Sequence, residues 1–367
     1  MRLRQAGALL TLAVAAAVAA GCGASANGDK AGDGAPDGPL VLRMASIPWN
    51  PSDAPPVADF IRRVRALSRG TVQVKVINQW GLYAPSAEAQ VIRATAAGQV
   101  DLGWAGSRVF DTIGVPGLAA LSAPLLIDSY PLENAVLKSS LPARMLTGLS
   151  RVHVTGLAVL GDALRHPLAV RRPLLAPADW RGLSVGTYRS GVQEQAIRAL
   201  GAIPVVAFGP YRTHDLVSGT IQGFELDVQR YAHGADVPVP SARYVTANVV
   251  LWPQFDVLVA NPARLASLTA QQRGWLLQAA QQAAANSVNL VAGQDGPYIR
   301  QACAMGARFA TATPADLAAM RRAFSPVYQN LGHEQQASAF IRQIEQLKNT
   351  TPPGPAPAIP VGCAARK

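Results

Sequence analysis

The segment from Pro177 to Glu225 constrains the fold more than any other part of the chain. Short apolar runs that predict strands alternate there with amphipathic runs that predict helices, at residues 183–187, 191–200, 204–206, 211–218 and 223–228. Each predicted helix ends before a glycine, Gly201 or Gly219, and glycine accepts the left-handed backbone that commonly follows a helix. Strands that alternate with helices at this spacing predict an α/β fold with a parallel sheet.

Sequence motifs recur in a fixed order along both halves of the chain. The second half contains Asp179-Trp180-Arg181-Gly182-Leu183, Leu200-Gly201-Ala202-Ile203-Pro204-Val205 and the run from Leu216 to Glu225, and the first half has counterparts at residues 69–74, 88–103 and 118–126. From about Leu40 to Gln346, their order and spacing resemble the solute-binding proteins of TRAP transporters, the tripartite ATP-independent importers. The resemblance implies a two-lobed α/β fold like that of periplasmic binding proteins, with a hinge and a long lobe-bridging helix.

The resemblance also implies a function. Proteins of this family capture a small organic solute between their lobes, outside the cytoplasm, and deliver it to the permease subunits of the transporter in the membrane. We therefore expect a monomer that binds a small organic acid, needs no cofactor and catalyses no reaction. A binding protein of another importer, such as an ABC importer, or of a sensory system stays open, as does an enzyme, because a fold does not determine a function.

The N-terminus reads as a targeting segment at residues 1–22. Arg2 and Arg4 precede an apolar run from Ala6 to Ala20, and Ala19-Ala20-Gly21-Cys22 resembles a lipobox in which the cysteine is lipidated. The alternative is a plain signal peptide that is cleaved near Gly21. Residues 23–39 are rich in small and polar residues and predict a flexible tether, so we expect the protein to be anchored by lipid to the outer face of the cell membrane.

The remaining chain divides into two predicted lobes and a tail. Lobe I comprises residues 40–160 and 255–295, lobe II comprises residues 161–254 and 296–350, and residues 351–367 form the tail. Apolar residues make up 49% of the chain and charged residues 15%, which indicates well-buried globular domains. A helix predicted at residues 269–294 would be the long helix that braces both lobes in the resembled family.

The net charge of +11 does not by itself predict a nucleic-acid partner. The arginines are scattered, and the local cluster Arg62, Arg63, Arg65 and Arg69 falls on the exposed side of a predicted helix. If Cys22 is lipidated, Cys303 and Cys363 remain, and an even pair outside the cell predicts one disulfide. No His or Cys spacing typical of a metal site occurs, and the common motifs of serine hydrolases, nucleotide-binding loops and metalloproteases are missing.

The candidate ligand contacts come mainly from the resemblance. Arg165 matches a family position at which an arginine faces the cleft, and the alternative is a surface arginine in a turn. The arginine with which many family members clamp a carboxylate aligns with Gly186, so Arg189 in the following loop is the candidate replacement, unless it is simply solvated. Glu225 matches a family glutamate, while Leu226 replaces the amide that often follows it.

Other candidates fall at predicted strand ends and adjoining loops, where ligands of α/β proteins bind. They are Trp49, Trp104, Tyr188, Asp227 and Phe255, together with Glu88 in the first turn of a predicted helix. Each aromatic residue alone is equally compatible with core packing. With Arg165 present and Gly186 at the usual clamping position, we expect a ligand with at most one carboxylate, whose remainder lies near Trp104 and Glu225.

Overall fold

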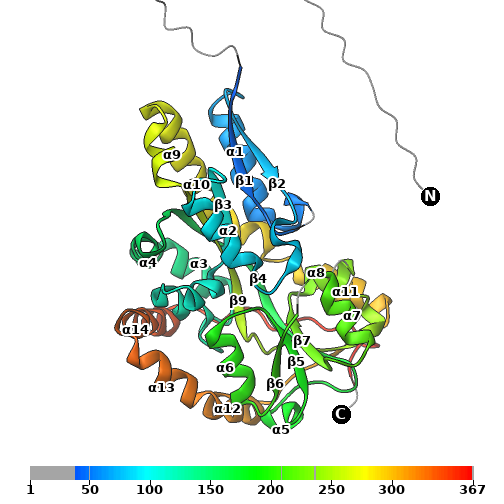
Figure 1. Ribbon diagram of the computed structural model, residues 1–367. Coiled ribbons are helices and arrows are strands. Elements are labelled where there is room, and N and C mark those ends of the chain that lie inside the picture. The colour runs from blue at the N-terminus through cyan, green and yellow to red at the C-terminus, as the bar shows by residue number, and fades with distance from the viewer. Residues whose placement is uncertain (1–37, 49, 208, 235–236, 366–367) are drawn as a thin grey trace, which may run out of the picture. The chain divides into compact units, whose positions relative to one another are not determined.

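The computed structural model describes residues 38–48, 50–207, 209–234 and 237–365, and Figure 1 shows the arrangement of their elements. Residues 1–37 and Trp49 lie outside this part of the chain. The predicted signal peptide, the lipidation of Cys22, nearly all of the tether and the role of Trp49 therefore stay predictions.

The described strands form one continuous path in the order β2-β1-β3-β9-β4-β7-β5-β6, and β8 pairs with β4 and β10. Their bounds are β1 (Leu40–Ala45), β2 (Val72–Ile77), β3 (Leu102–Gly106), β4 (Thr155–Ala169), β5 (Ser184–Thr187), β6 (Ile203–Val206), β7 (Gly223–Leu226), β8 (Tyr244–Thr246), β9 (Trp252–Ala260) and β10 (Arg308–Ala310). In the first part of the sheet, which comprises β1, β2 and β3, β1 is parallel to β2 and β3. In the second part, β5 is parallel to β6 and β7, as the alternation of strands and helices predicted.

Strands β4 and β9 connect the two parts. They are antiparallel partners from the pair Thr155 and Ala260 to the pair Arg165 and Trp252. The register shifts twice, between Gly156 and Ala158 and between Gly161 and Leu164. From the next residue onwards, β4 pairs with β7 instead. Strand β4 contains residue 160 and strand β9 contains residue 255, at which the predicted lobe boundaries fall. Arg165 therefore sits where the chain passes from one part of the sheet to the other.

The α-helices pack around these strands. Their bounds are α1 (Pro55–Leu67), α2 (Ala87–Ala96), α3 (Tyr130–Lys138), α4 (Leu141–Leu146), α5 (Pro177–Trp180), α6 (Gly191–Ala199), α7 (Pro210–Val217), α8 (Val228–His233), α9 (Pro262–Ser267), α10 (Ala270–Val291), α11 (Asp295–Ala304), α12 (Pro314–Ala323), α13 (Ser325–His333) and α14 (Gln335–Thr350). Short 3-10 helices are η1 (Pro51–Asp53), η2 (Trp80–Tyr83), η3 (Ser107–Thr112), η4 (Pro116–Ser122), η5 (Thr147–Val152) and η6 (Val239–Ser241).

The helix predicted at residues 269–294 is α10, and its N-terminal cap is Thr269. The side chain of Thr269 accepts a hydrogen bond from the backbone N–H of Gln272, while the Gln272 side chain accepts one from the backbone of Thr269. Helix α10 packs on α1, α3 and β4, and the next helix, α11, packs on α8 (Figure 1). Helix α14 packs on α3 and η4. The predicted residue limits of the two lobes stay a prediction.

The predicted disulfide between Cys303 and Cys363 is present in the structure. Cys303 lies on α11, and Cys363 is fully buried near the end of the chain. Phe309 on β10 forms an isolated bridge with Ala364. The C-terminal segment is therefore held to the second part of the fold by a covalent bond and by backbone pairing.

Candidate ligand-binding site

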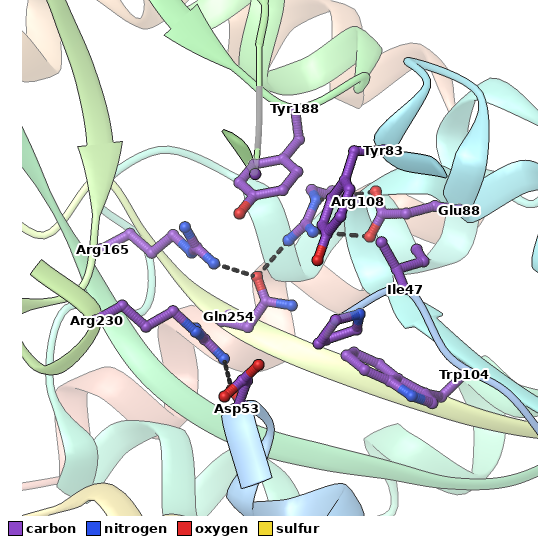
Figure 2. Close-up of a pocket in the computed structure, with 12 residues that line it drawn as sticks. Ile47, Asp53, Tyr83, Glu88, Trp104, Arg108, Arg165, Tyr188, Arg230 and Gln254 are labelled. Atoms are coloured by element: carbon purple, nitrogen blue, oxygen red, sulfur yellow. Dashed lines mark hydrogen bonds and ion pairs between the residues drawn. The ribbon is translucent and has the colours of Figure 1, made fainter. Parts of the chain in front are cut away.

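A cavity of about 100 Å³ lies between the two parts of the fold, and Figure 2 shows the side chains around it. The segment from residue 47 to residue 108 contributes the loop after β1, η1, η2, α2, β3 and η3. The segment from residue 165 to residue 254 contributes β4, the loop after β5, the loop before α7, α8 and β9. The lining residues are Ile47, Pro48, Asp53, Tyr83, Glu88, Trp104, Arg108, Arg165, Tyr188, Gly209, Arg230 and Gln254.

Arg165 reaches this cavity from β4 and is almost fully buried. Its Nη1 lies 3.2 Å from Oε2 of Glu225, which is on the neighbouring strand β7 and is also buried. Burial alone would lower the pKa of Arg165, but Tyr188 and Glu225 raise it above its usual value. Arg165 is therefore a permanently charged donor held in place by a buried carboxylate.

Arg108 reaches the cavity from η3, on the opposite side. Glu88 binds it through two contacts, Nη2 to Oε1 at 2.7 Å and Nε to Oε2 at 3.1 Å. Glu88 Oε1 also accepts a hydrogen bond from the backbone N–H of Gly106 at 2.9 Å. A Cβ at Gly106 would lie 2.7 Å from the Arg108 guanidinium carbon, so this packing requires glycine.

The two arginines meet at the side chain of Gln254 on β9. The carbonyl oxygen Oε1 of Gln254 accepts hydrogen bonds from Nη1 of Arg108 and, at 3.0 Å, from Nη2 of Arg165 (Figure 2). Tyr188 lies against the same guanidinium groups. Its ring centroid is 3.6 Å from Cζ of Arg108 and 5.0 Å from Cζ of Arg165. Two buried cations from different parts of the fold thus converge on one point.

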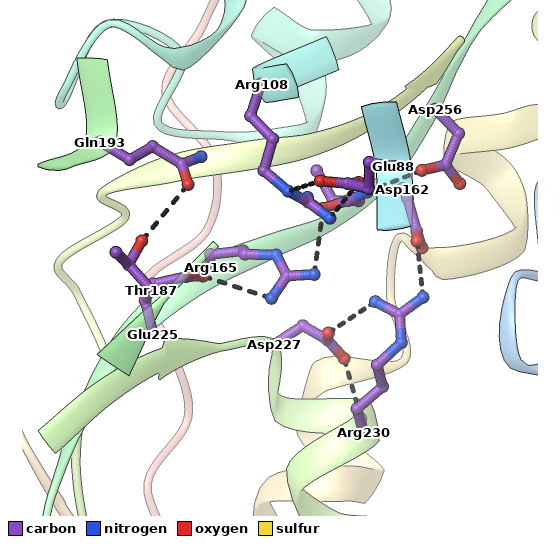
Figure 3. A network of polar contacts seen from close by, with 11 residues as sticks. Glu88, Arg108, Asp162, Arg165, Thr187, Gln193, Glu225, Asp227, Arg230 and Asp256 are labelled. Carbon is purple, nitrogen blue, oxygen red and sulfur yellow. Dashed lines mark hydrogen bonds and ion pairs between the residues drawn. The ribbon is translucent and has the colours of Figure 1, made fainter. Parts of the chain in front are cut away.

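Arg230 extends a polar network below this point (Figure 3). Its guanidinium contacts Asp227 and Asp162 at 2.9 Å each and donates to the backbone carbonyl of Asp53 at 2.8 Å. Asp227 also caps α8 by accepting from the backbone N–H of Arg230. Burial would raise the pKa of Asp227, but Arg230 and then Arg165 lower it below its usual value.

Two further buried carboxyl groups lie close to Asp162. Burial, with the charge of Asp162 as the next cause, raises the pKa of Asp256 to about 7. The same two causes raise the pKa of Glu133 well above its usual value, and Glu133 accepts a hydrogen bond from the backbone N–H of Asp162 at 3.1 Å. Glu133, Asp162 and Asp256 therefore form a cluster of buried carboxyl groups next to the site, and Asp162 is paired with Arg230.

The structure places the sequence-predicted residues in three groups. Arg165, Trp104, Tyr188 and Glu88 line the cavity. Glu225 and Asp227 stand behind it as partners of Arg165 and Arg230. The Arg189 side chain is exposed, Phe255 is buried in the core, and neither lines the cavity; Trp49 lies outside the described residues.

Sequence reasoning missed Arg108, Arg230 and Gln254. A signal existed, because Arg108 follows the end of β3 and Arg230 follows the end of β7, the same placement that predicted Trp104 and Asp227. The space beside Gly186 is occupied, since a Cβ there would lie 2.8 Å from Cδ1 of Ile221. Gly186 therefore does not widen the site for a bulkier ligand.

In the part of the chain that the structure describes, no group of three or more His, Cys, Asp or Glu residues is arranged to hold a metal ion. None of the described helices combines the length and apolarity needed to cross a membrane.

The family model described as "Bacterial extracellular solute-binding protein, family 7" matches residues 55–335 of the chain. One relative is the C4-dicarboxylate-binding periplasmic protein DctP of Rhodobacter capsulatus, 26% identical over 168 residues that cover 46% of this chain and 49% of the relative. Another is the uncharacterized protein y4mM of Sinorhizobium fredii, 27% identical over 187 residues, 51% of this chain and 34% of the relative. The chain thus spans about half of the first relative and a third of the second.

Solved structures of TRAP periplasmic solute-binding proteins have the same fold. The protein from Ralstonia eutropha H16, with bound (S)-2-acetolactate, has a TM-score of 0.74 at 20% identity and is matched over 84% of this chain and 99% of its own. The protein from Chromohalobacter salexigens, with bound D-glucuronate, has a TM-score of 0.73 at 19% identity, over 83% and 99%. The protein from Shewanella oneidensis, with bound succinate, has a TM-score of 0.72 at 19% identity, over 84% and 98%. These matches confirm the predicted two-lobed α/β fold.

Proposed function

The chain belongs to family 7 of the bacterial extracellular solute-binding proteins, the solute-binding components of TRAP transporters. On this premise we propose that it captures a small organic acid with one carboxylate. The acid is held between the two lobes and passed unchanged to the permease subunits in the membrane. The observation that carries the proposal is the convergence of Arg108 and Arg165 on one point of the cavity.

Two guanidinium groups around one point favour a carboxylate. Each guanidinium offers five N–H donors in a fixed fork, and charge-assisted hydrogen bonds are about twice as strong as neutral ones. Arg108 uses two of its nitrogens for Glu88, and Arg165 uses one for Glu225. Both arginines are thereby held in position and still direct donors at the same point in the cavity.

The charges around the cavity favour a single carboxylate. Arg108 is neutralised by Glu88 and Arg165 by Glu225, while Arg230 is shared by two aspartates. One ligand carboxylate can take the point at which both guanidinium groups already direct donors. A second carboxylate would be buried away from that point and beside these carboxylates, and such a burial is costly. The two arginines contributed by different parts of the fold replace the single clamping arginine that Gly186 cannot supply.

The rest of the ligand meets aromatic and neutral groups. Trp104, Tyr188 and Ile47 line the cavity, and the indole N–H of Trp104 donates to Oγ of Ser46 at 3.2 Å. Apolar walls with a few fixed polar groups are typical of sites for small organic ligands. Of the ligands named for the similar structures, (S)-2-acetolactate and D-glucuronate carry one carboxylate and succinate carries two, and all three are small organic acids, which supports that broader class here.

Capture closes the site around the ligand. Strands β4 and β9 join the two parts of the fold, and Arg108 and Arg165 come from opposite sides of the cavity. A ligand that contacts both arginines binds the closed form more tightly than the open form and thereby shifts the equilibrium toward closure. Lipidation at Cys22 would keep the protein at the outer face of the membrane, next to the permease.

The test is a calorimetric screen of pairs of acids and their amides. We expect D-glucuronate, pantoate or another monocarboxylate to bind, and the matching amide to bind at least tenfold more weakly. Arg108→Lys keeps the charge beside Glu88 but loses the fork of donors, so the affinity for the acid should fall about tenfold, the value of one ionic hydrogen bond of ~1.5 kcal/mol. Arg189→Lys, at an exposed position, is the matched control. Equal binding of acids and amides would rule the proposal out.

A further inference from the structure

The side chain of Gln254 occupies the center of the proposed acid site. It is 4% exposed, and its carbonyl oxygen accepts hydrogen bonds from both Arg108 and Arg165. Its amide nitrogen donates to Oδ1 of Asp256 at 2.6 Å. Gln254 therefore lies at the point toward which the two guanidinium groups converge (Figure 2).

The orientation of this amide is determined by its neighbours. If the carboxamide were reversed, its NH₂ group would face two guanidinium groups, and its oxygen would face the carboxyl group of Asp256. Donors would then face donors, and acceptors would face acceptors. The carbonyl oxygen is thus fixed on the side of the arginines.

We propose that Gln254 is an internal, neutral occupant of the carboxylate position, and that an acid displaces its carbonyl oxygen from Arg108 and Arg165 on binding. This inference rests on the proposed function, and it adds a residue that sets the affinity and selectivity of the site. A carboxylate makes charge-assisted hydrogen bonds to both guanidinium groups, which a neutral amide oxygen cannot match.

The consequence is discrimination between acids and neutral analogues. A ligand amide or hydroxyl group offers the two arginines an oxygen no better than that of Gln254, so its binding gains nothing from the exchange. A ligand carboxylate gains the difference between a charged and a neutral acceptor. Specificity of this kind depends on what the ligand must displace as well as on what it contacts.

The test compares Gln254→Ala with wild type, using sodium formate as the smallest carboxylate probe. Removing the internal occupant should make formate bind about tenfold more tightly to the variant than to wild type, since one ionic hydrogen bond no longer has to be replaced. Binding is followed by the rise in thermal midpoint with formate concentration. Sodium chloride and formamide at equal concentrations are the controls and should not reproduce the rise.

Gln254→Glu provides a second, independent measurement. A fixed carboxylate between the two arginines should abolish the response to formate. The matched control is Gln282→Glu, because Gln282 on α10 also accepts a hydrogen bond from an arginine, Arg63, at 3.1 Å, but lies outside the cavity. Gln282→Glu should respond to formate as wild type does.

Weaker formate binding by Gln254→Ala than by wild type, or an unchanged response of Gln254→Glu, would overturn the inference. The outcomes separate it from the proposed function. If organic acids bind wild type but Gln254→Ala gains no affinity for formate, the function stands and the role of Gln254 falls. If Gln254→Ala gains affinity for formate while none of the organic acids binds wild type, Gln254 is an occupant of the position and the proposed ligand class is wrong.

Discussion

Replacement of Arg165 by methionine should lower the free energy of unfolding by about 3–5 kcal/mol, because it leaves a buried carboxylate without its cation. The side chains of Arg165 and Glu225 are 2% and 1% exposed, and their charged atoms lie 3.2 Å apart. Glu225 Oε1 already has no hydrogen-bond partner among the described residues. Loss of Arg165 would therefore remove the only ion pair recorded for Glu225 in that part of the chain.

Removing both charges should restore most of the stability. In Arg165→Met/Glu225→Gln no buried charge is left unpaired, and replacement of a whole buried ion pair is often close to neutral. We expect the double variant to unfold within about 2 kcal/mol of wild type and still to bind the acid tenfold to a hundredfold more weakly, the loss of about 1.5–3 kcal/mol for an ionic hydrogen bond. This separates the role of Arg165 in binding from its role in folding.

Urea unfolding followed by circular dichroism at pH 7.5 measures the stabilities, and calorimetry measures binding. Arg189→Met, at an exposed position, is the control and should change the free energy of unfolding by less than about 0.5 kcal/mol. A single variant as stable as wild type, or a double variant no more stable than the single one, would refute the reasoning from burial and pairing.

Three further predictions concern other parts of the chain. Burial lowers the pKa of His166 from 6.5 to about 4. Between these pH values the unfolded chain binds a proton at His166 and the native state does not. The free energy of unfolding should therefore fall by roughly 3 kcal/mol as the pH drops from 6.5 to 4. His166→Gln should remove this slope in urea titrations, and an unchanged slope would contradict the assignment. Reduction of the Cys303–Cys363 disulfide, whose cysteines are 60 residues apart, should cost roughly 4 kcal/mol in the entropic model, and equal stability before and after reduction would count against it. Cys22→Ala should release the protein from the membrane fraction or leave it unprocessed, and unchanged retention and processing would exclude the lipid anchor.

The alternating elements of the second half were predictable from sequence because local signals agree with the fold. The strand predicted at residues 183–187 is observed at Ser184–Thr187, and the helix predicted at 191–200 is observed at Gly191–Ala199. Ser190 caps that helix by accepting from the backbone N–H of Gln193. Turn and cap residues identify such elements without knowledge of the tertiary structure.

Strand β4 shows where sequence reasoning reached its limit. Residues 155–160 and 168–170 predict separate strands, yet the structure has one strand from Thr155 to Ala169. The residues between them include Asp162 and Arg165, which interrupt the apolar pattern. They are tolerated inside a buried strand because Arg230 pairs with Asp162 and Glu225 pairs with Arg165. These partners are distant in sequence, so no local pattern reveals them.

The candidate site was predictable to a similar extent. The strand-end rule found Trp104 and Tyr188, and the resemblance found Arg165. The convergence of Arg108 and Arg165 on Gln254 depends on three segments that only the fold brings together. Arg189 follows the same strand-end rule but is exposed, which shows that the rule indicates a region of the fold and not the direction of a side chain.

A crystal structure with the monocarboxylate that binds most tightly in the calorimetric screen would test the central claim most directly. We predict that one ligand carboxylate lies within hydrogen-bond distance of the guanidinium groups of both Arg108 and Arg165, and that the carbonyl oxygen of Gln254 has moved away from them. A carboxylate that contacts neither arginine, or that is held by Arg189 instead, would contradict the proposed site.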